Sequence, residues 1–155
     1  MNETDIIKKQ LATERQHFAD VASACFSVIR QARVEQADFD HSGGFAQACR
    51  DYFGFALTRF EGSARSDLAA RFDGAAQPWQ AAGQWLAFLE TFNAESHRRF
   101  SALDALSARA VSVAEWRAVS KVDADTIFRE RALYERVKAA LPAGVTLTSV
   151  PPAAS

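Results

Sequence analysis

The chain has 155 residues, 48% of them hydrophobic and 24% charged, which suits one globular domain with a sizeable core. Eighteen Lys and Arg residues against 19 Asp and Glu residues give a net charge of −1, so charge gives no reason to expect nucleic acid or an anionic membrane as a partner. No apolar run approaches the roughly 20 residues of a membrane span. The N-terminus is polar and does not resemble a signal peptide. We therefore expect a cytoplasmic protein.

An apolar stripe that recurs in steps of four and three residues predicts a first helix over residues 5–37. The stripe consists of Ile7, Leu11, Phe18, Val21, Cys25, Val28 and Ala32. Glu14 occupies a stripe position where leucine would be expected, and His17 follows about one helical turn later. A carboxylate buried in such a stripe needs a charged or hydrogen-bonding partner from another helix.

Turn residues divide the rest of the chain into three further helices. They are expected over residues 45–72, 78–106 and 113–141. Gly62 is a point where the second of these helices is expected to kink or fray. The last either continues to residue 141 or breaks between Ser120 and Asp123, because an aspartate there can cap a new helix.

Four amphipathic helices with short connections predict an all-α fold, an up-down-up-down antiparallel four-helix bundle. Strand signals are nearly absent, since β-branched residues are sparse and no Asn-Gly or Asp-Gly hairpin turn occurs. We expect a single helical-bundle domain over residues 1–141. Residues 142–155 are rich in proline and alanine, and we expect them to form a mobile tail.

Charged residues recur beside the apolar stripes at comparable heights, counted at about 1.5 Å per residue along each helix. One layer contains Glu14, His17, Arg59 and Glu130, and a second layer, one or two turns away, contains Arg99 and Asp123. Opposite charges therefore coincide in both layers. In a structural interpretation these residues are buried ion pairs that fix the register of the helices. In a functional interpretation all six line a polar pocket that binds a ligand.

A metal site is the alternative that Glu14 and His17 suggest. They form a Glu-x-x-His motif on one helix face, which ferritin-like di-iron bundles use in pairs. This chain has one such motif, and its three histidines are too few for a hemerythrin-like site. Arg59 and Arg99 near the same axis would repel a divalent cation. The leading expectation is therefore no cofactor, and the alternative is iron, manganese or zinc on Glu14, His17 and Glu130.

Cys25 and Cys49 both lie on apolar stripes, which predicts small buried side chains with free thiols. Counted from the first turn, their heights differ by roughly 9 Å on antiparallel helices. A disulfide needs Cα atoms within about 7 Å. We therefore expect both cysteines to remain reduced.

The leading functional hypothesis is a non-catalytic bundle that binds a protein partner, a second copy of itself in a homodimer, or a small ligand. No nucleophile elbow and no phosphate-binding glycine loop occurs in the sequence. One alternative is the metal-carboxylate bundle. The other is an enzyme in which Arg59 or Arg99 holds an anionic substrate beside Glu130, although the sequence offers no reaction for it.

Overall fold

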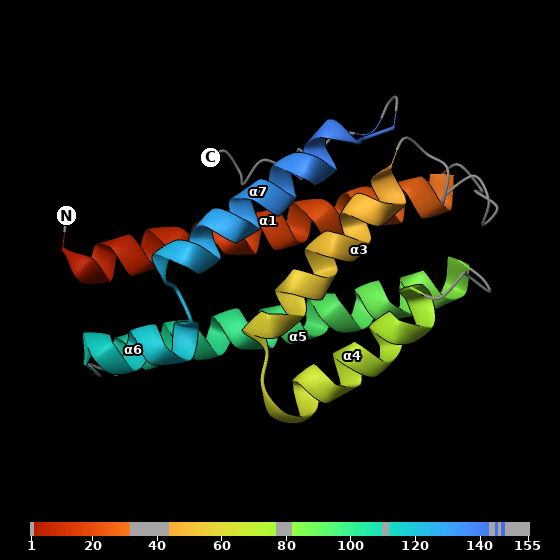
Figure 1. The fold of residues 1–155 in the computed structure, drawn as a ribbon. Helices are drawn as coiled ribbons and strands as arrows, with labels where there is room; N and C mark the ends of the chain where they lie inside the picture. The colour runs from red at the N-terminus through yellow and green to blue at the C-terminus, as the bar shows by residue number, and fades with distance from the viewer. Residues whose placement is uncertain are drawn as a thin grey trace.

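The computed structural model describes residues 2–31, 44–76, 82–109, 112–142, 145 and 147. These residues form helices and no strand, so the all-α prediction is confirmed for the described part of the chain (Figure 1). The helices are α1 (Glu3–Gln31), α3 (Phe45–Ala56), the 3-10 helix η1 (Leu57–Arg59), α4 (Gly62–Ala76), α5 (Ala82–Ala108), α6 (Val113–Ser120) and α7 (Ala124–Ala139).

The prediction of four helices is wrong, because the segment expected to form one helix over residues 45–72 folds as two. After η1, Phe60 adopts an extended backbone with φ −103 and ψ 161. Gly62 then has a φ of +62, which glycine adopts without the steric cost that a side chain would add. The chain reverses there, and α4 runs opposite to α3 (Figure 1). The up-down-up-down four-helix bundle is therefore not confirmed.

Of the two possibilities that the sequence left open for the last helix, the structure shows the break between Ser120 and Asp123. Lys121 adopts the left-handed conformation with a φ of 59, which ends α6. The Asp123 side chain then caps α7 by accepting a hydrogen bond from the Thr126 backbone N–H at 2.8 Å. The first predicted helix was expected to reach residue 37, and residues 32–37 lie outside the described part of the chain.

Aromatic side chains fill the core where α3, α4 and α5 meet. The Phe53 ring lies 5.0 Å from the Phe92 ring and 5.3 Å from the Phe88 ring between centroids. The main helix pairs are α4 with α5, α3 with α7 and α1 with α5 (Figure 1). Leu147 is also buried against this core, while most of the predicted tail lies outside the described residues. None of the described helices is both long and apolar enough to cross a membrane.

Cys25 and Cys49 are buried free thiols, yet the predicted separation between them is wrong. Their thiols lie close enough for Cys25 to affect the pKa of Cys49. The height count assumed parallel helix axes, whereas α3 crosses α1 obliquely (Figure 1). Burial raises the pKa of the Cys49 thiol, and the neighbouring Cys25 raises it further. The reactive thiolate form is therefore disfavoured in the folded protein.

We expect neither thiol to react readily with a thiol reagent while the protein is folded. Both should react once the protein is unfolded in denaturant, because unfolding exposes them to solvent. The measurement is a colorimetric thiol titration with and without denaturant. A count of zero thiols in the denatured, unreduced protein would show a disulfide and contradict the prediction.

Candidate functional site

Glu14 of α1 lies between two guanidinium groups. Glu14 Oε2 accepts a hydrogen bond from Arg59 Nε at 3.0 Å and lies 2.8 Å from Arg59 Nη2. Glu14 Oε1 lies 3.0 Å from Arg99 Nη1, an ion-pair contact whose angles fall outside those of a hydrogen bond. All three side chains are at most 8% exposed. The Glu14 carboxylate in the first apolar stripe is therefore compensated by two positive charges, one from η1 and one from α5.

The same two arginines hold the turn between α6 and α7. Arg59 Nη1 donates to the Lys121 carbonyl at 2.6 Å, and Arg59 Nη2 donates to the Ser120 carbonyl at 2.9 Å. Arg99 Nη2 also donates to the Ser120 carbonyl, at 2.8 Å. The last carbonyls of a helix lack partners within the helix and carry the negative end of its dipole, so cations stabilise them. We call Glu14, Arg59, Arg99 and these two carbonyls the arginine clamp.

Burial opposes the charges of Glu14 and Arg99 more strongly than their mutual attraction favours them. Burial raises the pKa of Glu14 above its usual value, and the charges of Arg99 and Arg59 counter part of that rise. Burial likewise lowers the pKa of Arg99 to about 10, although the nearby Glu14 carboxylate raises it. Such a buried cluster adds little net stability but penalises any packing that would separate its members.

A second polar group joins α1, α3 and α7. His17 Nδ1 lies 2.8 Å and 3.0 Å from the two carboxylate oxygens of Glu130, and Tyr52 OH donates to Glu130 Oε2 at 2.8 Å. The His17 ring stacks on Tyr134 with centroids 3.6 Å apart, and Tyr134 OH donates to Asp20 Oδ2 at 3.1 Å. His17 Nδ1 faces both carboxylate oxygens, so a proton on Nδ1 fits this contact.

Five of the six predicted site residues meet in these two adjoining groups, and Asp123 does not. The prediction that Asp123 lies beside Arg99 is wrong, because Asp123 is exposed and caps α7. Arg99 lies against Glu14 instead of in a second layer. The height count treated residues 113–141 as nearly straight, whereas the left-handed Lys121 redirects the chain before Asp123. That these residues bind a ligand stays a prediction.

Sequence reasoning missed Tyr52, Tyr134 and Asp20, as well as the carbonyls of the α6–α7 turn. Tyr52 lies one helical turn after Cys49 on the same apolar stripe, and a buried tyrosine hydroxyl usually needs a hydrogen-bond partner. That need was the available signal for its bond to Glu130. The backbone carbonyls carry no such signal, because every residue type has one.

The contacts of Glu14, His17 and Glu130 do not fit the predicted metal alternative. Within the described residues, no three His, Cys, Asp or Glu side chains gather where they could hold a metal ion. The carboxylate of Glu14 faces two guanidiniums, which repel a divalent cation. Glu130 accepts from the Tyr52 hydroxyl and lies against His17 Nδ1, so its oxygens already have partners.

Among the surface pockets that border α6, two have largely apolar walls. The α1–α5–α6 groove has a volume of about 370 Å³ and is lined by residues that include Leu11, Phe100 and Trp116. The α4–α5–α6 groove has a volume of about 550 Å³ and is lined by residues that include Leu106 and Val119. Both arginines of the clamp also line the second groove, so the buried charges support one of its walls.

The site has to be interpreted from its own chemistry, because no protein-family model, curated protein or solved structure matches the chain.

Each nitrogen of the Arg59 guanidinium donates to a protein oxygen. Arg99 Nε donates to the Arg59 carbonyl at 3.1 Å, and its other two nitrogens contact Ser120 and Glu14. The interior arginines are thus engaged in holding the fold, whereas the two grooves are open to solvent.

Proposed function

We propose that this chain is a non-catalytic binding module that holds a helical segment of a partner protein in the α4–α5–α6 groove. The observation that carries the proposal is an apolar groove with an excess of positive charge around it. Leu103 and Leu106 of α5 contribute apolar surface, and Val119 of α6 stands 54% exposed beside them. An amphipathic helix binds such a groove by burying its own apolar face there.

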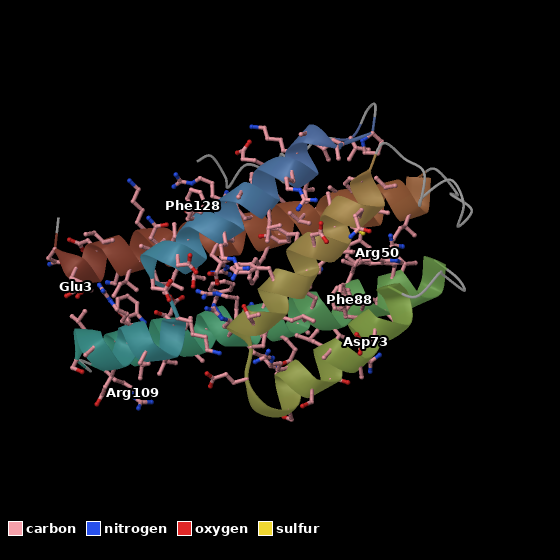
Figure 2. The ribbon with its side chains drawn as sticks, viewed as in Figure 1. Glu3, Arg50, Asp73, Phe88, Arg109 and Phe128 are labelled. Carbon is pink, nitrogen blue, oxygen red and sulfur yellow. The ribbon has the colours of Figure 1, made fainter. Side chains whose placement is uncertain are left out.

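The charge of the groove indicates which charge the partner helix should carry. The charged residues that line it are Arg59, Arg98, Arg99, Arg109, Glu61 and Glu95. Glu61 is paired with Lys121 at 2.9 Å, and Glu95 is paired with Arg98 at 2.5 Å. Arg59 and Arg99 share the single carboxylate of Glu14, so these three residues keep a net positive charge. Arg109 adds a further positive charge and lies at the outer edge of the fold (Figure 2). A partner helix with an acidic polar face therefore complements the groove.

The arginine clamp gives the groove a fixed shape. It ties the C-terminal end of α6 to η1 and α5, and residues of all three elements line the groove. A groove that is already formed before binding does not lose conformational freedom when the partner arrives, and this favours affinity. The buried charges thus serve binding indirectly, by holding a surface in place.

The test is binding of a fluorescently labelled synthetic peptide of about four helical turns, with a leucine stripe and glutamates on its other face. The matched peptide has lysine in place of every glutamate. We expect saturable binding of the acidic peptide by fluorescence anisotropy, and binding of the basic peptide at least about tenfold weaker. Equal binding of the two peptides, or binding of neither, would contradict the proposal.

Two aspartate variants locate the peptide. Val119→Asp adds a negative charge to the rim of the groove and should weaken acidic-peptide binding by at least about tenfold. Phe128→Asp is the matched control, because Phe128 is 73% exposed on the outer side of α7 (Figure 2). It should leave binding unchanged. If sedimentation instead showed a dimer of the wild type that Val119→Asp dissociates, a second copy would be the occupant and the acidic partner helix would be excluded.

A further inference from the structure

We propose that the α1–α5–α6 groove is a separate site that binds a small carboxylate with an apolar tail. This inference goes beyond the partner helix, which occupies the groove on the α4 side. The groove of about 370 Å³ has apolar surface from Leu11, Phe100 and Leu103, which suits a hydrocarbon tail. Glu3 of α1 pairs with Arg117 of α6, so the helices on either side of it are tied together.

Trp116 supplies a hydrogen-bond donor that has no acceptor. The residue lines the groove and is 3% exposed. Its indole N–H is shielded from solvent and finds no hydrogen-bond acceptor among the residues that the structure describes. Buried donors in folded proteins are nearly always paired, so an unpaired one calls for a missing acceptor. A ligand carboxylate would provide that acceptor once the side chains that cover the indole edge move aside to admit it.

Lys8 and Arg15 supply the positive charge for the same ligand. They lie about two helical turns apart on α1, and both line the groove. Neither side chain has an ion-pair partner within the described part of the chain. Asp104 is the one acidic residue among the groove's lining residues, so the lining carries a net positive charge. Charged donors of this kind form strong hydrogen bonds with a carboxylate.

The hydrogen-bond donors and the apolar walls of the groove together indicate the chemical class of its ligand. A pure hydrocarbon would leave Lys8, Arg15 and the Trp116 N–H unused. An amine would meet two like charges. A fully hydrated inorganic anion would gain nothing from the Leu11 and Phe100 surfaces. An amphipathic carboxylate such as octanoate uses both the cations and the apolar wall.

The test follows the indole N–H of Trp116 by nuclear magnetic resonance in the full-length ¹⁵N-labelled chain. Trp116→Phe identifies the resonance by its absence. We expect octanoate to shift this resonance in a saturable manner, because the N–H gains a charged acceptor. Octanol and octylammonium have the same tail with a neutral or cationic head, and both should bind at least about tenfold more weakly. Octanol binding as tightly as octanoate would overturn the carboxylate assignment.

Calorimetry on variants then tests whether octanoate binds in this groove or elsewhere on the surface. Arg15→Gln and Trp116→Phe should each weaken octanoate binding by about five- to tenfold, since each removes one donor. Arg131→Gln, an exposed arginine on α7, is the control and should leave the affinity unchanged. The absence of a saturable shift, or unchanged affinity in both groove variants, would overturn the site. Either failure leaves the partner-helix proposal intact, because that proposal is tested at Val119.

Discussion

Glu14→Ala is expected to lower the free energy of unfolding by about 3–5 kcal/mol, because it leaves two buried guanidinium groups without their counter-charge. Arg59 and Arg99 would keep their bonds to the α6–α7 carbonyls but lose the carboxylate that contacts both. Glu14→Gln retains the shape and one acceptor oxygen, so it should lose less. The measurement is urea unfolding, with linear extrapolation of the free energy to water.

The control for this variant is Glu135→Ala on α7. Glu135 is exposed, so removing its carboxylate should change the free energy of unfolding by no more than about 0.5 kcal/mol. A Glu14→Ala protein that unfolds like the Glu135→Ala protein would show that the carboxylate is not a buried counter-charge.

Arg59→Met should also cost about 3–5 kcal/mol, for two separate reasons. It breaks a buried ion pair with Glu14. It also removes the donors to the Ser120 and Lys121 carbonyls, and each buried acceptor left unpaired costs about 1–3 kcal/mol. Arg98→Met is the matched control, because the Arg98 side chain is 74% exposed and forms only a surface pair with Glu95. The same urea experiment compares the two, and similar midpoints would contradict the prediction.

A variant that removes both Glu14 and Arg59 distinguishes an isolated ion pair from a cluster of three charged residues. For an isolated buried pair, Glu14→Leu with Arg59→Met would be close to neutral, because the lost attraction is offset by the lost desolvation cost. Arg99 contacts the same carboxylate, so the double variant leaves its guanidinium buried and uncompensated. We therefore expect the double variant to remain destabilised, and the addition of Arg99→Met to recover part of the loss. Full recovery in the double variant would rule out a role for Arg99.

The sequence was sufficient to predict the helical class and part of the charge pairing. The four-and-three stripe identified α1 and placed Glu14 inside it, and a charge in that position has to be paired. Counting heights along the helices then brought Glu14 near Arg59 and His17 near Glu130, as the structure shows. Both predictions were correct for the same reason. They depend only on the periodicity and the rise per residue of a straight helix, and these do not depend on how the helices pack.

The errors in helix number and in the position of Asp123 arise where the backbone leaves a straight helix. The apolar pattern continues from Phe60 to Leu68 and Phe72, so periodicity alone did not show that the chain reverses at Gly62. The sequence left a break near Lys121 open and gave no direction for α7 after it, so Asp123 was misplaced. Direction after a turn depends on backbone angles and on tertiary contacts such as the arginine clamp, which no local pattern encodes.

The central claim is that the buried charges form a structural clamp and do not serve as ligands of a metal. The most direct measurement is urea unfolding of the wild type and Glu14→Ala, each with and without a metal chelator. The clamp predicts that chelator leaves both unfolding curves unchanged and that Glu14→Ala loses about 3–5 kcal/mol in either condition. A wild type whose stability falls when chelator is added, and whose sensitivity disappears in Glu14→Ala, would contradict it.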